Sequence, residues 1–263
     1  MDSLKTGLFA LLLLLGQISN AQCPGALNCE SAEVFCAIDY LNGFACNTPN
    51  SPNSSFPHAN LCFGVGTPTN LNWWGFVGNG LPLSLIINFD IGGCQNLEGV
   101  QAGVFEANCD GSQIWDCNAN CNTSTFTLSG ATQKCEIYYL WVDGCNSDIC
   151  TYTISVSGSG GPPTLLRPMP SLQVSGDLCA GGNVGVCFPG YADSCDPVFE
   201  WTVDGTPAGG PDDDCVEITL PDSEPFAPIQ VCLTATIGNP NVPGAICDQD
   251  IVCTTVTLSL IHI

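Results

Sequence analysis

Histidine, the side chain on which much acid–base catalysis depends, occurs only at His58 and His262 in this sequence of 263 residues. A serine or cysteine nucleophile needs a well-placed histidine, and His58 lies in the Pro/Asn-rich loop SSFPHANLC. Glycoside hydrolysis needs only two facing carboxylates. The chain has 25 Asp and Glu, but they occur singly or in turns, and none marks a cleft. We therefore interpret His58 as an ordinary loop residue and expect no catalytic residues.

Aromatic side chains are the next candidates, because their flat faces can stack on sugar rings. Of five tryptophans, Trp141 follows an alternating strand pattern and Trp201 occupies a core-like strand position. Trp73 and Trp74 are consecutive, so in a strand they point to opposite faces. Trp115 lies in a turn-rich, cysteine-containing segment. We take Trp73, Trp74 and Trp115 as the candidate ligand-binding residues. The alternative for each is packing in the interior, which we weigh as the more common outcome.

Carboxylates are grouped in the stretch GPDDDC, where Asp212, Asp213 and Asp214 are consecutive. Calcium takes six to eight oxygen ligands from a shaped loop, and this stretch has no recognisable calcium-loop pattern. Calcium at these three residues is the cofactor hypothesis. A solvated acidic turn is the simpler interpretation.

Nineteen cysteines follow an N-terminal leader that carries Lys5, an apolar run from Leu8 to Leu15, and small residues at Ser19 and Ala21. These features predict a signal peptide over residues 1–21 and a disulfide-rich secreted protein. No pair has the C-x2-C spacing of zinc knuckles, and histidine is scarce, so structural zinc is not expected. Twelve cysteines precede residue 157 and seven follow residue 170, which predicts an unpaired cysteine in the second half.

The formal net charge of −22, with only three Lys and Arg, excludes electrostatic binding to nucleic acid, because nothing would neutralise the phosphates. Anionic membrane surfaces are disfavoured for the same reason. The leader is too short to span a bilayer, and no later segment could do so, so we expect no membrane insertion. With 45% hydrophobic residues, the chain can build a core.

Both halves of the chain have the pattern of short strands, rich in β-branched or aromatic residues and separated by turn residues. A Gly/Ser/Pro-rich stretch without buried apolar residues is expected to link them at 159–170. We predict an all-β, disulfide-rich protein of two antiparallel β-sandwiches, at 22–158 and 171–257. The expected strands cover residues 72–77, 83–90, 100–107, 124–130, 136–144 and 150–158, then 171–176, 183–188, 198–205, 215–220, 229–237 and 251–258. Only 29–41 has a weak helical pattern.

The strand series NWWGFV, PLSLIINF, GVQAGVFEANCDG, FTLSG and YYLWVDG resembles a jelly-roll module of large secreted bacterial proteins, the pre-peptidase C-terminal type. The opening CPGALNCESAEVFC is similar to the cysteine-bearing leader of such modules in bacteria with type IX secretion. In the second half, VFEWTVDGTP, CVEITLP and VCLTATIGN resemble a polycystic-kidney-disease (PKD) or related Ig-like domain, although the Phe-Gly pair of the usual PKD motif is absent at Trp201 to Gly205. The resemblances imply spacer, adhesion or sugar-binding modules outside the cell.

The last six residues, 258–263, extend past the expected final strand and match a translated sequencing adapter, so we expect the natural protein to continue. A genuine terminal strand is the alternative. Together these observations predict a non-catalytic binding, adhesion or scaffold fragment of a secreted, cell-surface-attached protein. Its partner would be an extracellular glycan or protein surface. The alternative is an accessory region of a secreted peptidase or glycosidase.

Overall fold

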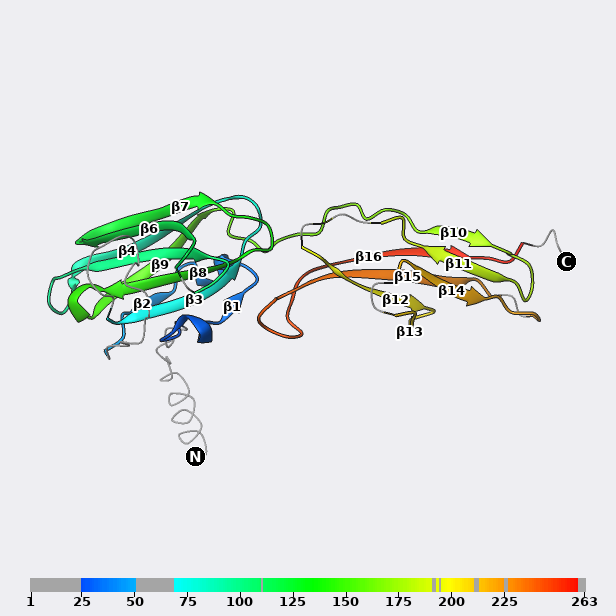
Figure 1. Cartoon of the computed structure of the whole chain (residues 1–263), viewed down its shortest axis with the longest axis horizontal. Coiled ribbons are helices and arrows are strands. Elements are labelled where there is room, and N and C mark those ends of the chain that lie inside the picture. Colours follow the sequence, from blue (N-terminus) through cyan, green and yellow to red (C-terminus); the bar gives the residue numbers. More distant parts are fainter. Residues whose placement is uncertain are drawn as a thin grey trace, which may run out of the picture.

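The computed structural model describes residues 25–50, 69–109, 111–190, 193, 195–210, 213–224 and 227–259. The predicted signal peptide, both histidines, Asp212 and residues 260–263 lie outside this part. The described chain forms two β-sandwiches placed end to end (Figure 1), and its sheets are antiparallel except where the two-residue strand β1 pairs with β3 in parallel. This confirms the predicted all-β, disulfide-rich fold class. No helical segment among the described residues is long and apolar enough to cross a bilayer.

The first sandwich packs a five-stranded sheet on a four-stranded sheet. The five-stranded sheet has the order β1-β3-β8-β5-β6, with β1 Val34–Phe35, β3 Leu71–Val77, β8 Ile137–Gly144, β5 Val100–Glu106 and β6 Ile114–Asn122. The four-stranded sheet has the order β2-β9-β4-β7, with β2 Ala45–Asn47, β9 Cys150–Gly158, β4 Pro82–Cys94 and β7 Ser124–Ala131. Short 3-10 turns lie at Cys29–Ser31, Ile38–Leu41 and Cys145–Ser147.

The strands β3, β8 and β5 of the five-stranded sheet are buried on both faces, and β3 has no exposed residue. One face packs on the four-stranded sheet through a core that includes Trp74, Leu140 and Tyr152. The other face carries a second cluster with Trp73, Phe105 and Trp141. The segment before β1 lies against this second face, where Ala26 pairs with Trp73.

The second sandwich packs a three-stranded sheet on a four-stranded sheet around one core that contains Trp201. The three-stranded sheet has the order β10-β11-β14, with β10 Gln173–Gly176, β11 Asn183–Cys187 and β14 Cys215–Thr219. The four-stranded sheet has the order β13-β12-β15-β16, with β13 Thr206–Ala208, β12 Val198–Val203, β15 Ile229–Gly238 and β16 Ile246–Val256. Alternation along β15 buries Val231, Leu233, Ala235 and Ile237, because successive strand side chains face opposite sides.

The connection between the sandwiches differs from the expected linker. Leu165 and Met169 are buried in the second core, so this stretch does contain buried apolar residues. The backbone N–H of Leu165 also donates to the Asp248 carboxylate of β16. The Gly, Ser and Pro content predicted an exposed linker, but two apolar side chains of this stretch pack into the core of the second sandwich.

Two local predictions also differ from the structure. Residues 29–41 form two 3-10 turns and β1 in place of a helix. Residues 114–122 form β6, although Asn and Asp disfavour strands; pairing with β5 and the disulfide Cys121–Cys145 hold this segment extended. At the C-terminal end, Leu258 packs partly against the second core and the N–H of Ser259 donates to the Leu178 carbonyl.

Candidate functional site: the junction of the two sandwiches

The most distinctive region of the described chain is the junction, where the sandwiches are joined covalently as well as by the connecting chain. Cys36, directly after β1, bonds to Cys247 at the start of β16. Cys135, in the turn before β8, bonds to Cys195 in the loop before β12. Each bond therefore crosses from the first sandwich to the second.

The pairing accounts for the odd number of cysteines in the second half. Two of its seven cysteines pair with the first half and four pair with one another, which leaves one over. That one is Cys179, the free cysteine among the described residues, so the predicted unpaired cysteine is confirmed. Seven disulfides have both cysteines described, which indicates an oxidising, extracellular environment. Cys46 and Cys117 are disulfide-bonded as well.

An ion pair lies beside the second crossing disulfide. The Nζ atom of Lys134 is 2.8 Å from Oδ1 of Asp193, and the Asp193 side chain is fully buried. Burial opposes the charged form of Asp193, but hydrogen bonds from Lys134 and from the N–H groups of Leu166 and Cys195 outweigh it. They lower the pKa of the Asp193 carboxyl.

Hydrogen bonds add to the junction beside the first crossing disulfide. The loop after β15 reaches the first sandwich, where Asn239 Nδ2 donates to the carbonyl of Val34. In the same loop, Asn241 Nδ2 donates to the Tyr139 hydroxyl at 3.0 Å. Two disulfides, an ion pair and these hydrogen bonds cross between the sandwiches in addition to the connecting chain, so the junction is a fixed interface, unlike the mobile arrangement that is usual between domains.

A cleft of about 270 Å³ opens beside the Cys36–Cys247 disulfide. Its apolar lining includes Phe35, Tyr40, Pro162 and Ile246. Tyr40 is 64% exposed, and its ring centroid lies 6.1 Å from that of Phe35. Glu33 is the one ionisable carboxylate among the described lining residues. A single carboxylate beside an apolar wall provides a surface for contact and no acid–base pair.

Sequence reasoning did not point to this cleft. Its lining residues come from four separate segments, and Tyr40 has no motif around it. The only available sequence signal was the presence of Cys36 and Cys247, whose pairing the spacing does not determine.

The structure places Trp73 and Trp74 on opposite faces of β3, but it corrects their assignment as ligand-binding residues. Both side chains are 0% exposed. Trp74 packs edge-on to Tyr152 in the inner core, and Trp73 lies 5.8 Å from Phe105 in the outer cluster. Neither ring offers a face to a ligand, because both faces of their sheet are covered. Trp141 and Trp201 are core residues, as expected.

Trp115 is partly buried and also packs within the first sandwich. Its indole lies over Gly130 of β7, and its Nε1 donates to the Ala131 carbonyl at 2.9 Å. The ring meets Tyr138 in a T-shaped contact. Trp115 thus joins β6 to β7 across the open side of the sandwich, and the three tryptophans do not form a common site.

The acidic stretch behaves as a turn in its described part. The carboxylate of Asp213 accepts a hydrogen bond from the N–H of Gly210, and its carbonyl accepts one from Trp201 Nε1. Asp213 and Asp214 line a hollow of about 380 Å³ with Asp193 and Asp196. Because Asp212 lies outside the described residues, calcium here stays a prediction.

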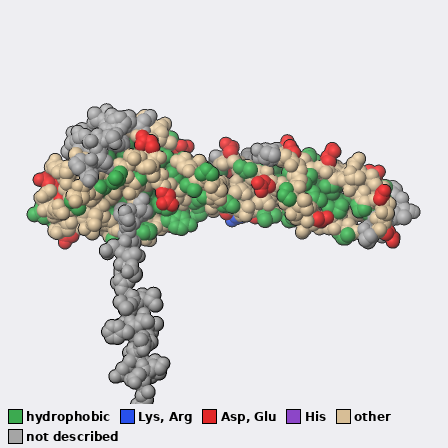
Figure 2. All heavy atoms as spheres, turned by 90° about the horizontal axis from the view of Figure 1, so that it is seen from below, with side chains coloured by type: hydrophobic (Ala, Val, Ile, Leu, Met, Phe, Trp, Pro, Cys, Tyr) green, Lys and Arg blue, Asp and Glu red, His purple; other side chains and the backbone are tan. Residues whose placement is uncertain are grey.

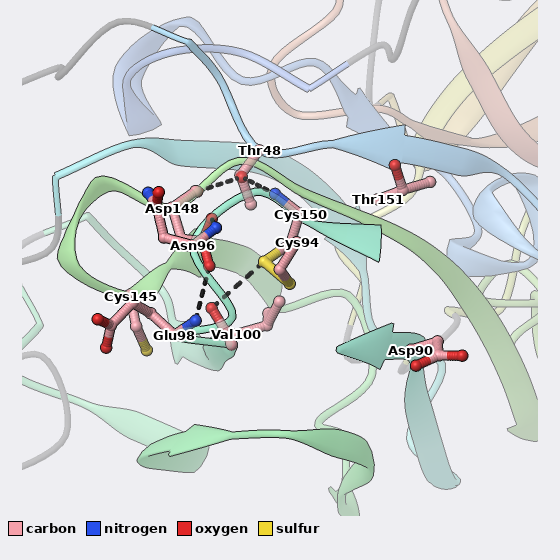
Figure 3. The surroundings of a disulfide bond; sticks show 12 residues. Thr48, Asp90, Cys94, Asn96, Glu98, Val100, Cys145, Asp148, Cys150 and Thr151 are labelled. Atoms are coloured by element: carbon pink, nitrogen blue, oxygen red, sulfur yellow. Dashed lines mark hydrogen bonds between the residues drawn. A yellow bond between two sulfur atoms is a disulfide. The ribbon is translucent and has the colours of Figure 1, made fainter. Parts of the chain in front are cut away.

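One cluster among the described residues has the composition of a metal site: Cys94, Asp148 and Cys150. The two cysteines form a disulfide between β4 and β9, so neither is a thiolate that could bind a metal. Figure 3 shows the Asp148 carboxylate turned toward the neighbouring loop, where it accepts hydrogen bonds from the N–H groups of Asn96 and Glu98. The cluster therefore fixes a loop at one end of the first sandwich.

A second buried carboxylate, Asp143, lies one residue before the end of β8. It accepts hydrogen bonds from the N–H groups of Thr69 and Asn70 and from Gln101 Nε2 at 2.7 Å. Burial raises the pKa of Asp143, and these hydrogen bonds only partly oppose the change. These hydrogen bonds come from uncharged groups, and through them Asp143 orders the chain that enters β3.

Comparison with known proteins adds no family. No family model matches the chain, and no curated protein matches it. Solved structures that share some resemblance include the spore cortex lytic enzyme SleM of Clostridium perfringens, with 10% identity, a TM-score of 0.25 and coverage of 49% of this chain and 34% of that one. A Bifidobacterium dentium beta-glucuronidase has 11% identity, a TM-score of 0.22 and coverage of 79% and 42%. The chain thus spans less than half the length of these structures, and at such TM-scores the likeness supports no functional conclusion.

Proposed function

We propose that this chain is a non-catalytic extracellular scaffold that binds or adheres, and that it belongs to a larger secreted surface protein. The observation that supports it is the junction, where two disulfides cross between the sandwiches. A chain that only tethered two independent domains would need no covalent bond beyond the backbone. A fixed junction keeps the surfaces of both sandwiches in constant relative orientation, as a scaffold requires.

The distribution of charge suits an exposed rod of this kind. Figure 2 shows acidic side chains spread over both sandwiches on the face in view. Such a surface favours solubility and disfavours nucleic acid and anionic membranes. A carbohydrate or a protein surface is the partner class we propose, since both can be bound through uncharged contacts.

Small-angle scattering on the full chain tests the rigid scaffold. Ensemble fitting of the wild-type scattering curve should give one narrow distribution of the radius of gyration. Variants that lack one crossing pair, C36A/C247A or C135A/C195A, should change it little. The variant that lacks both pairs should broaden it, because only the connecting chain and polar contacts remain. A broad distribution in the wild type would contradict the proposal.

The enzyme alternative is tested at the junction cleft. The full chain should show no turnover of a panel of chromogenic glycosides and peptides. If the wild type shows turnover and Glu33→Gln abolishes it, the cleft would be identified as an active site. The circular dichroism spectrum of the variant should match that of the wild type, which shows that the fold is unchanged. If the chain is instead an accessory region of a secreted peptidase or glycosidase, the same rigid body is expected. The two proposals differ in whether the larger protein contains a catalytic unit.

A further inference from the structure

The outer face of the β2-β9-β4-β7 sheet is unusual for a protein of net charge −22, because its middle has no charged side chain. The register aligns Ser129, Ser84 and Ser157 in one row across β7, β4 and β9. The next row holds Thr127, Ile86 and Ser155. A third row holds Asn88, Thr153 and Ala45.

These side chains point to solvent. Their neighbours in sequence, such as Leu85, Leu128 and Ile154, are buried in the core, and alternation turns the hydroxyl residues outward. Thr127, Ser129 and Ser157 are exposed, and none of the residues in the three rows is buried. Among the described residues, the carboxylates near this face lie at its margin, where Asp90 follows the third row and Asp116 accepts from the N–H of Ser129.

Much of the hydrogen-bonding capacity of this face is unused within the described chain. Ser155 Oγ accepts from Asn88 Nδ2 at 2.8 Å. The hydroxyls of Ser84, Thr127, Ser129 and Ser157 have no hydrogen bond to another described group, whereas each can donate one and accept two. They stand on a grid of about 4.8 Å between strands and about 6.8 Å along a strand.

The outer faces of the second sandwich differ. Glu200 stands in the middle of β12, in the row with Thr234 and Ile251. Glu217 stands in the middle of β14. The neutral face is therefore a local property of one sheet and does not follow from a general lack of charge.

We propose that this neutral face binds a neutral polysaccharide, an inference that rests on the proposed binding scaffold and names its ligand class. A cationic or anionic ligand would find no countercharge here. A protein partner, including a second copy, would bury at least seven hydroxyl and amide groups, which costs free energy wherever they stay unpaired. A neutral glycan has its own dense array of hydroxyls, at spacings comparable to the strand grid. These hydroxyls can form hydrogen bonds with the hydroxyl and amide groups of the face.

Affinity electrophoresis of the full chain in gels that contain laminarin, soluble starch, arabinoxylan or galactomannan tests the inference. The wild type should be retarded by at least one of these polysaccharides. Thr127→Glu and Ser157→Glu, each of which places a carboxylate on the face, should weaken retardation at least tenfold. Thr127→Ser should keep it, because the hydroxyl remains.

Thr255→Glu on β16 is the matched control, since it makes the same change at another exposed strand position. It should be retarded as the wild type is, and thermal unfolding should confirm that every variant is folded. Retardation that Thr127→Glu and Ser157→Glu leave unchanged would place the ligand elsewhere and overturn the inference.

Two further outcomes would also overturn it. If none of the four polysaccharides retards the wild type, a neutral polysaccharide is not the ligand. The proposed rigid scaffold would be unaffected by this result, because scattering tests it separately. A wild-type dimer in size-exclusion chromatography that Thr127→Glu converts to a monomer would show that the face binds a second copy.

Discussion

In the first sandwich, three tryptophans are fully buried on the two faces of one sheet, whereas the second sandwich has a single core with one tryptophan, Trp201. The disulfides differ too. In the second sandwich, Cys187–Cys215 and Cys232–Cys253 join residues that lie directly opposite each other on neighbouring strands. Their side chains face away from the core, since Val186 and Val231 beside them face inward.

Both of these bonds attach an edge strand, β14 or β16, to its inner neighbour. An edge strand lacks a partner on one side and slips or frays more easily than a central one. The first sandwich also has internal disulfides, Cys29–Cys109, Cys94–Cys150 and Cys121–Cys145, and it adds a second covered sheet face with large buried side chains. The second sandwich has the smaller core, and its bonds cross its edge strands and reach the first sandwich. The contrast therefore lies in the buried aromatic side chains, since disulfides stabilise both.

The largest effect should come from removing a buried aromatic ring in the first sandwich. Trp141→Ala should lower its free energy of unfolding by about 3–5 kcal/mol, because a large cavity would remain in a covered face. Denaturant titration followed by circular dichroism measures it. Trp115→Ala, where the ring is partly exposed, should cost clearly less. If both substitutions lowered the free energy of unfolding equally, burial of large aromatic side chains would not be what stabilises the first sandwich.

Removing a cross-strand disulfide should act next most strongly, and on the second sandwich. C187A/C215A and C232A/C253A open loops of 28 and 21 residues, so each should cost about 3 kcal/mol. C121A/C145A is the matched control in the first sandwich, with a separation of 24 residues. Differential scanning calorimetry should show that these two variants lower the unfolding temperature of the second sandwich more than the control variant lowers that of the first.

Sensitivity to reductant should follow exposure. Cys215 and Cys253 are exposed, whereas Cys94 and Cys150 are buried. Dithiothreitol under native conditions should therefore reduce the cross-strand bonds of the second sandwich first, because a thiolate must reach the sulfur that it attacks. Alkylation and peptide mass mapping over time give the order. If Cys94–Cys150 were reduced at the same rate in the native protein, the first sandwich would be less closed than its burial indicates.

The smallest effects should be opposite pH dependences at the two buried aspartates. The lowered pKa of Asp193 means that its contribution to stability is present above the ordinary carboxyl pKa of about 3.9 and is lost as pH falls through the folded-state pKa. The raised pKa of Asp143 gives the reverse: stability from this group increases as pH falls through its folded-state pKa toward about 3.9.

Variants separate the two cases. The stability difference between the wild type and Asp193→Asn should narrow as pH falls, whereas the difference from Asp143→Asn should widen. Urea titrations between pH 7 and pH 3 measure both. Parallel trends would mean that Asp143 has a cationic neighbour among residues outside the described part, or that Asp193 does not pair with Lys134 in solution.

Much of the fold was readable from local patterns. The alternation of β15, the aromatic run of β3 and the turn residues between them predicted strands that the structure confirms, because strand side chains reveal which face is buried. β6 was not predicted, since its Asn, Asp and Cys residues are held extended by partners distant in sequence. The consecutive Trp73 and Trp74 indicated opposite faces but not that both faces are covered.

Cysteine content, charge and strand pattern, which depend on the sequence alone, determined that this is a disulfide-rich, acidic, all-β chain. Only the tertiary structure decided which cysteines pair across the junction, which tryptophans are buried and which sheet has a neutral outer face. These properties depend on contacts between residues far apart in the chain, such as Cys36 with Cys247 and Ser84 with Ser157. Local sequence fixes the direction of a side chain along its strand, whereas what covers that side chain is fixed by how the sheets pack.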